Sequence, residues 1–158
     1  MPALFSITSM AQTDLPGVWA IEQTLSGPWT YGQLEAELAT PHGWHFVITP
    51  PASRRILGYI FGTTILDEAE IRKLAVAPDY RRQGIASRLL AEIDHFLAAA
   101  AVATCFLELR AANTAALALY QKNGFQIVGQ RKNYYTLPTD DAILARKLFS
   151  FLDLRSPS

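Results

Sequence analysis

Residues Lys73–Leu90, KLAVAPDYRRQGIASRLL, are the most informative stretch of this chain. An apolar run ends at Pro78, a strongly helical run follows, and the segment RRQGIA between them contains a glycine, Gly84. A helix N-terminus presents unpaired backbone N–H groups and the positive end of the helix dipole, and a glycine there lets the backbone approach a ligand closely. The stretch therefore predicts a strand, an anion-binding turn and a helix. A plain helix start with a solvated basic edge is the alternative.

The strand that leads into this turn has an interrupted alternation. In EAEIRKLAVAP, residues 68–78, apolar side chains stand at positions 69 and 71 and then at positions 74 and 76. One inserted residue at Arg72-Lys73 would produce this change of phase. The pattern favours a β-bulge that separates the strand from a neighbour and frees backbone groups for a ligand. A fully buried strand, whose pattern carries no phase information, is the alternative.

Periodicity and turn residues outline the other elements. The order β-α-α-β-β-β-α-β-α-β-β predicts an α/β (α+β) fold in which a mixed, mostly antiparallel sheet is flanked by about four helices. No repeat, linker or low-complexity segment interrupts the chain, so residues 1–158 are expected to form one domain. The predicted strands are residues 3–8, 44–49, 56–64, 68–76, 104–110, 125–135 and 142–151, with a turn at 138–140, and the predicted helices are residues 14–25, 30–38, 82–101 and 113–123.

The composition restricts the classes of partner. Fourteen basic and fourteen acidic residues cancel, so no overall field attracts nucleic acid or an acidic membrane, although local basic pairs suit a compact anion. The start lacks the pattern of a secretory signal, and no apolar run approaches the length of a membrane span. One cysteine and three histidines, His42, His45 and His95, show no metal-ligand spacing. We expect a cytoplasmic monomer with no metal, no direct nucleic-acid partner and no membrane partner.

The first stretch resembles the acetyl-CoA signature of the GNAT acyltransferase superfamily. That signature, Q/R-x-x-G-x-G/A, is filled here by Arg81, Gly84 and Ala86, although many members have glycine in place of Ala86. The resemblance implies a GNAT-like acyl-CoA N-acyltransferase fold with acetyl-CoA as the acetyl donor. It also implies two sets of cofactor-binding residues: the backbone of Leu74, Ala75 and Val76 for the pantetheine arm, and the amides of Arg82, Gln83, Gly84, Ile85, Ala86 and Ser87 for the pyrophosphate.

Two further stretches resemble a narrower group, the RimI-type N-terminal acetyltransferases. They are FLELRAANTAALALYQKNGF at residues 106–125 and RKNYYTLPTDDAILARKL at residues 131–148, and IEQ and PW near the front extend the match to residues 15–148. The resemblance implies transfer of acetyl to the N-terminal alanine of a small-subunit ribosomal protein. It places the proton acceptor at Glu108, the proton donor at Tyr120, a cofactor contact at Asn113 and the walls of the peptide entrance at Trp29, Tyr134 and Tyr135.

These roles agree with the chemistry of amide formation. A protein α-amine has a pKa of about 7.7 to 8.0, so a substantial share is protonated at neutral pH and cannot attack. A carboxylate such as Glu108 removes that proton, directly or through water, and a tyrosine hydroxyl such as Tyr120 returns one to the departing thiolate. Backbone N–H groups near Val76 are suited to stabilise the developing oxyanion.

Each assignment has a structural alternative. Glu108 at a sheet edge would be a charge paired with Arg110, although its apolar neighbours favour a buried strand in which an acid needs a function or a counterion. Tyr120 would be a core aromatic with its hydroxyl at the surface, and Asn113 a helix cap. The three residues at the peptide entrance would simply pack on the surface.

Cys105 is the only thiol available for a covalent mechanism. Strand alternation places Cys105 on the face opposite Glu108, and no histidine is near it in the sequence, so we interpret it as a small core residue. Direct attack of the amine in a ternary complex is therefore favoured over ping-pong chemistry. Two other functions stay open: a GNAT enzyme that acetylates a lysine side chain or a small amine, and a non-catalytic acyl-CoA-binding regulatory module.

Overall fold

The computed structural model describes residues 4–149, which form a seven-stranded sheet with helices on both faces. The strand order is β1-β2-β3-β4-β5-β7-β6, and every neighbouring pair is antiparallel except β4 and β5. The predicted mixed, mostly antiparallel sheet with four helices is confirmed. The strands are β1 Ser6–Ser9, β2 Gly43–Thr49, β3 Gly58–Ile65, β4 Glu68–Val76, β5 Thr104–Arg110, β6 Gln126–Thr136 and β7 Thr139–Leu148, and the helices are α1 Leu15–Glu22, α2 Tyr31–Leu38, α3 Ile85–Ala99 and α4 Thr114–Lys122.

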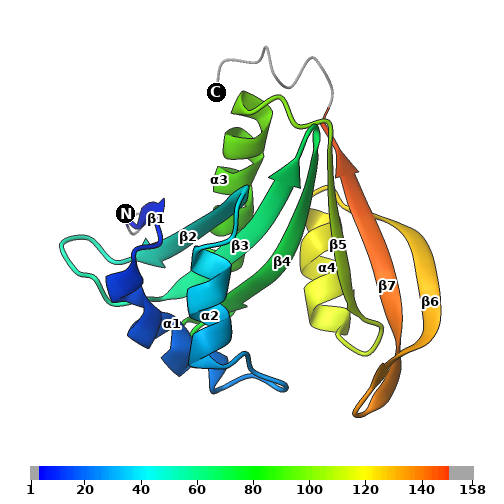
Figure 1. Ribbon diagram of the computed structural model, residues 1–158, viewed down its shortest axis with the longest axis horizontal. Helices are drawn as coiled ribbons and strands as arrows, with labels where there is room; N and C mark the ends of the chain where they lie inside the picture. Colours follow the sequence, from blue (N-terminus) through cyan, green and yellow to red (C-terminus); the bar gives the residue numbers. More distant parts are fainter. Residues whose placement is uncertain (1–3, 150–158) are drawn as a thin grey trace.

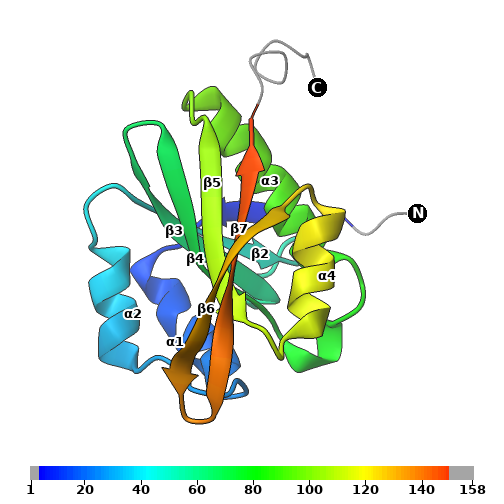
Figure 2. The ribbon, with the colours of Figure 1, turned by 90° about the vertical axis from the view of Figure 1, so that its right-hand side faces the viewer.

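Each face of the sheet carries its own apolar layer. Figure 2 shows α1 and α2 on one face and α3 and α4 on the other. Side chains alternate along β3, so that Tyr59 and Phe61 pack under α1 and α2 while Ile60 packs under α3. Helix α3 contributes a stripe at helical spacing to the second layer: Ile85, Leu89, Ile93 and Leu97.

Strand β4 contains a β-bulge at Arg72. Phe61 pairs with Lys73 and the next residue, Gly62, pairs with Ile71, so Arg72 has no partner across the ladder. Residues 69 and 71 before the bulge and residues 74 and 76 after it therefore face the same apolar layer, the one under α3. The change of phase predicted from the sequence is confirmed.

Beyond the bulge, β4 and β5 diverge. The two strands pair only over Glu68–Glu70 and Thr104–Phe106. In Figure 1 they converge at the top and separate toward the bottom, so the arm that ends in β4 diverges from the arm formed by β5, β7 and β6. We call the place where the two strands separate the β4–β5 opening.

Some predicted boundaries were wrong. Helix α3 begins at Ile85 and not at residue 82, because Arg82 and Gly84 have left-handed backbone angles, with φ of 63° and 79°. The last hairpin turns at Leu137-Pro138 and not at residues 138–140, because Thr139 already pairs with Thr136 in the ladder. The predicted start of the first strand at residue 3 and the predicted end of the last strand at residues 150–151 lie outside the described residues.

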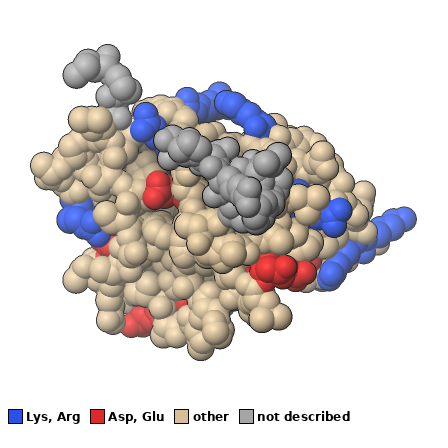
Figure 3. Space-filling model, turned by 90° about the horizontal axis from the view of Figure 1, so that it is seen from above, with Lys and Arg blue, Asp and Glu red and all other residues tan. Residues whose placement is uncertain are grey.

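The surface carries charges of both signs. Figure 3 shows separate patches of basic and of acidic side chains on a face that is otherwise largely uncharged, as the equal totals of the two signs suggest. Within residues 4–149, no helix combines the length and the apolar character that a membrane crossing needs. In the same part of the chain, no group of three or more His, Cys, Asp or Glu side chains is arranged to hold a metal ion.

Candidate active site

The turn before α3 exposes unpaired backbone N–H groups. Gly84 is the N-cap of α3, and the first helical hydrogen bond runs from the Arg88 N–H to the Gly84 carbonyl oxygen over 3.0 Å. No side chain of the described residues caps this helix. The first-turn N–H groups of Ile85, Ala86 and Ser87 therefore point out of a 15-residue helix at the positive end of its dipole. A Cβ on Gly84 would meet no atom within 4 Å, so the mouth of the turn is open.

The polar side chains of this turn bind the protein itself. The Arg81 Nε donates to the Val76 carbonyl oxygen over 3.2 Å, and its Nη2 donates to the Thr24 Oγ1 over 3.5 Å. The Gln83 Nε2 donates to the Asp79 carbonyl oxygen over 3.2 Å. These bonds fix the path of the turn between the end of β4 and the end of α1. Arg81 and Gln83 are therefore engaged within the fold, and the groups that the turn leaves free include the backbone amides at the start of α3.

The end of β4 leaves one backbone edge open. Leu74, Ala75 and Val76 pair with β3 on one side. On the other side, β4 has no pairing with β5 after Glu70. In a strand the N–H and C=O groups point alternately to the two neighbours, so this segment presents unpaired groups to the β4–β5 opening.

Glu108 lies on β5 and faces away from α3 and α4. Its neighbours Leu107 and Leu109 belong to the apolar layer under those helices. The burial expected for Glu108 was wrong: its side chain is 34% exposed, because β5 is covered on one face only. Its ion-pair partner is the Arg131 guanidinium at 3.7 Å. Arg110, the partner suggested by the sequence, instead donates to the Pro138 carbonyl oxygen over 2.8 Å.

A cavity of about 260 Å³ adjoins Glu108 where β4 and β5 begin to separate. Its second carboxylate, Glu70, was not among the residues predicted from the sequence. The available signal was the alternation in EAEI, which places Glu70 on the face opposite Ala69 and Ile71 and hence on the face of Glu108. The residues that line the cavity are Glu70, Phe106, Leu107, Glu108 and Leu144.

Tyr120 lies on the other face of β5. Its side chain is only 8% exposed, belongs to the same apolar layer as Leu107 and Leu109, and packs edge-on against Phe125 at 5.6 Å between ring centroids. None of the hydrogen bonds among the described residues uses its hydroxyl. Burial raises the pKa of Tyr120, so the hydroxyl keeps its proton at neutral and mildly alkaline pH. Glu108 and Tyr120 are thus a carboxylate and a protonated acid on opposite faces of β5.

Asn113 and Cys105 occupy the structural positions that the sequence suggested for them. The Asn113 Oδ1 accepts a hydrogen bond from the Ala116 N–H over 3.2 Å and caps α4, while its predicted cofactor contact stays a prediction. Cys105 is 1% exposed in the layer under α3. Burial raises the pKa of the Cys105 thiol to about 12, so almost none of it is the nucleophilic thiolate at neutral pH.

The three predicted substrate-binding aromatic residues lie on two sides of the β4–β5 opening. Trp29 is half-buried against Phe61 at 5.2 Å, and the guanidinium of Arg72 on β4 lies 5.6 Å from its ring. Tyr134 and Tyr135 contact each other edge-on at 5.2 Å on β6. Burial, with the nearby charge of Glu108 as a second cause, raises the pKa of Tyr135. Their part in substrate binding stays a prediction.

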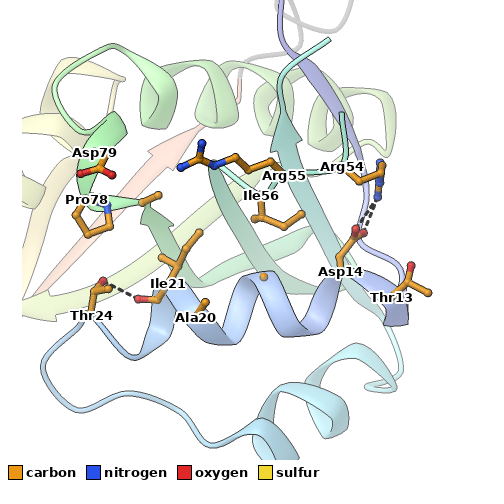
Figure 4. A pocket seen from close by; sticks show the side chains of 12 residues that line it. Thr13, Asp14, Ala20, Ile21, Thr24, Arg54, Arg55, Ile56, Pro78 and Asp79 are labelled. Carbon is orange, nitrogen blue, oxygen red and sulfur yellow. Dashed lines mark hydrogen bonds and ion pairs between the residues drawn. The ribbon is translucent and has the colours of Figure 1, made fainter. Parts of the chain in front are cut away.

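A larger cavity, of about 600 Å³, lies along α1 (Figure 4). One end of it is closed by the ion pair between Arg54 and Asp14, 2.7 Å apart. None of the predicted catalytic residues lines it, and the smaller cavity at Glu108 is therefore the candidate for the chemistry. The lining residues are Thr13, Asp14, Gly17, Ala20, Ile21, Thr24, Arg54, Arg55, Ile56, Ala77, Pro78 and Asp79.

A helix start with unpaired N–H groups, an open strand edge and a carboxylate beside the β4–β5 opening are parts that suit an acyl-CoA-dependent N-acyltransferase. The chain belongs to the acetyltransferase (GNAT) family, whose sequence model matches residues 7–125.

Its relatives include N-terminal acetyltransferases. The chain is 37% identical over 138 residues to the ribosomal protein bS18-alanine N-acetyltransferase of Escherichia coli, with 86% of this chain and 89% of that protein covered. It is 38% identical over 124 residues to the N-alpha-acetyltransferase RimI of Mycobacterium tuberculosis, with 76% and 75% covered. The crystal structure of the Escherichia coli ribosomal-protein-S18-alanine N-acetyltransferase matches with a TM-score of 0.85 at 34% identity, covering 94% of this chain and 96% of that chain.

Proposed function

We propose that this chain is a cytoplasmic enzyme that transfers the acetyl group of acetyl-CoA to the N-terminal α-amine of a protein. The acceptor that we propose is an N-terminal alanine of a small-subunit ribosomal protein, because the relatives are named for that reaction. The observation that carries the proposal is the placement of Glu108 in the cavity on one face of β5, where β4 and β5 begin to separate, and of Tyr120 in the apolar layer on the other face. A base on one face of β5 and an acid on the other suit a reaction in which the amine approaches from one side and the thioester from the other.

Acetyl-CoA fits three features of the chain. The amides of residues 82–87 at the start of α3 would hold the pyrophosphate. The unpaired edge of Leu74, Ala75 and Val76 would bond the pantetheine arm as a further strand would. Asn113, which already caps α4, would add a contact through its amide group.

The two titratable groups account for the proton transfers. Glu108 takes a proton from the ammonium form of the acceptor, directly or through water, and the neutral nitrogen attacks the thioester carbonyl carbon. Backbone N–H groups near Val76 stabilise the oxyanion while the C–N bond forms and the C–S bond breaks. The nitrogen loses a second proton, and the Tyr120 hydroxyl donates one to the leaving thiolate. The products are the amide, CoA as its thiol and one released proton.

Glu108→Gln tests this assignment. With an alanine-terminal peptide as acceptor and thiol release as the measurement, we expect kcat to fall by about 10²-fold or more, because a positioned general base contributes that much. Isothermal titration should give an almost unchanged Kd for acetyl-CoA. Glu92→Gln is the matched control, since Glu92 is an exposed glutamate on α3 and does not line the cavity. Full turnover by Glu108→Gln would remove Glu108 from the role of base.

The acceptor class is tested by competition. Three acceptors are offered at equal concentration together with acetyl-CoA. The first is an alanine-terminal peptide, the second is the same peptide with a blocked N-terminus and a free lysine side chain, and the third is a small polyamine. We expect turnover of the first alone. Preferential turnover of the lysine peptide or the polyamine would place the chain in another acceptor class, and binding of acetyl-CoA without any turnover would favour a non-catalytic acyl-CoA-binding module.

A further inference from the structure

Glu70 occupies the position where the two arms of the sheet part. It is the last residue of β4 that pairs with β5, opposite Phe106, and the strands have no pairing beyond it. Its side chain is exposed, and it lines the same cavity of about 260 Å³ as Glu108. Two carboxylates, one from each arm, therefore reach a single small space on the acceptor side of the sheet.

The charges around this cavity do not cancel. Glu108 has a basic partner, Arg131, at 3.7 Å. Glu70 forms no ion pair or hydrogen bond through its carboxylate with any residue in 4–149. The residues that line the cavity include two carboxylates and no basic side chain, so the lining is the complement of a cationic group.

The nearest cations along β4 are already paired elsewhere. The Arg72 Nε lies 3.1 Å from a carboxylate oxygen of Glu37, and the Lys73 Nζ lies 3.4 Å from one of Glu22. Both partners are buried, and a buried carboxylate that loses its cation is strongly disfavoured. Arg72 and Lys73 therefore stay with their partners, and the unpaired charge of Glu70 is left to a ligand.

The rest of the cavity is apolar. Phe106 and Leu144 lie on the same face of the sheet as the two carboxylates and supply its apolar walls. A ligand that satisfies both parts carries a cationic head directly beside a small apolar group. An N-terminal alanine has this combination, with an ammonium group and a methyl group on one carbon atom.

We propose that Glu70 is a specificity-determining residue that binds the ammonium form of the acceptor's terminal amine and holds it against Glu108. This assignment rests on the proposed function and names the part of the site that selects the amine. The ammonium group docks between the two carboxylates, Glu108 takes its proton, and Glu70 remains ionised beside the neutral nitrogen. Glu70 thus contributes to acceptor binding and not to proton transfer.

The test compares Glu70→Gln with the wild-type protein and with Glu68→Gln. Glu68 is the matched control, because it is an exposed glutamate on the same strand, two residues away, and does not line the cavity. Two ligands are used: an alanine-terminal peptide and the same peptide with its amine already acetylated. Their affinities for the complex of the protein with CoA are measured by titration, and kcat and KM for the free peptide are measured with acetyl-CoA.

We expect Glu70→Gln to weaken binding of the free-amine peptide by about tenfold or more, as loss of a charge-assisted contact does. The acetylated peptide has no ammonium group and should bind all three proteins equally. KM for the free peptide should rise while kcat changes little, which separates Glu70 from Glu108. A purely structural effect of the substitution would weaken both peptides alike.

Two results would overturn the assignment. Equal affinity of Glu70→Gln and Glu68→Gln for the free-amine peptide would show that Glu70 does not bind the amine, while the proposed function stands if the wild-type protein acetylates that peptide. A wild-type protein that binds acetyl-CoA but acetylates no free N-terminus would instead overturn the proposed function itself, and this inference with it.

Discussion

Tyr120 combines a buried ring with a hydroxyl that none of the described residues engages in a hydrogen bond. We expect Tyr120→Phe to lower kcat by about 10²-fold, because a positioned general acid contributes about that much when it protonates the leaving group. Its free energy of unfolding should stay level or rise slightly, since the phenyl ring fills the same space without a polar atom to desolvate. Steady-state kinetics and urea unfolding measure the two quantities. An unchanged kcat would mean that water supplies the proton.

The raised pKa of Tyr120 gives the same variant a second readout. An unfolded tyrosine ionises near pH 10, whereas the buried Tyr120 stays neutral well above that pH. The unfolded state therefore binds fewer protons than the folded state above about pH 10, and stability falls there by up to about 1.4 kcal/mol per pH unit for each such group. Below pH 10 this contribution is fully present. Unfolding midpoints measured between pH 8 and 11 should fall less steeply in Tyr120→Phe than in the wild-type protein.

At the residue scale, the sequence was sufficient for predictions that depend on the alternation of side chains along one strand. It was insufficient for predictions that depend on how two strands pair. Alternation along β5 was enough to separate Cys105 from Glu108. It could not reveal that α1 and α2 leave β5 uncovered, which is why Glu108 is exposed. The ion pair with Arg131 depends on the registers of β6 against β7 and of β7 against β5, and the shared cavity with Glu70 depends on the register of β4 against β5. No local pattern encodes these registers.

At the element scale, the bulge in β4 was predictable because it alters a period of two, and an inserted residue exchanges the faces of every later side chain. The start of α3 was less predictable. The left-handed angles of Arg82 and Gly84 are held by contacts from Arg81 and Gln83 to residues earlier in the fold. The helical pattern itself continues through those positions, so the sequence signal alone placed the boundary three residues too early.

The bulge also depends on a glycine across the ladder. A Cβ on Gly62 would lie 2.1 Å from the Glu70 carbonyl oxygen and 2.5 Å from the Trp44 ring. We expect Gly62→Ala to lower the free energy of unfolding by about 3 kcal/mol, as overpacking against backbone does. Gly32→Ala is the control: the nearest atom is 3.9 Å away in the exposed first turn of α2, so stability should rise by about 0.5 kcal/mol. Urea unfolding measures the free energy of unfolding of both variants, and equal values would contradict the steric role of Gly62.

At the scale of the whole molecule, the fold is two arms that share a short seam. The strands β4 and β5 pair over three residues each, and beyond that seam they leave the backbone of one arm open. The predicted base lies on one face of the second arm and the predicted acid on the other. The turn predicted to bind an anion lies at the end of the first arm. A ligand that reaches from this turn along the open edge of β4 would therefore contact both arms.

This arrangement predicts that acetyl-CoA stabilises the entire fold through the turn before α3. A ligand at 100 times its Kd adds about 2.7 kcal/mol to the free energy of unfolding. For a chain of 158 residues that corresponds to a rise in Tm of about 5 to 10 °C.

Gly84→Ala should lose much of the rise at the same ligand concentration. No atom would clash with the new Cβ, but a φ of 79° disfavours alanine by about 1 to 2 kcal/mol and shifts the turn away from its ligand-binding shape. Glu108→Gln should keep the full rise, because Glu108 acts on the acceptor side. Thermal unfolding with and without acetyl-CoA measures all three proteins, and an equal rise in Gly84→Ala would place the cofactor phosphates away from this turn.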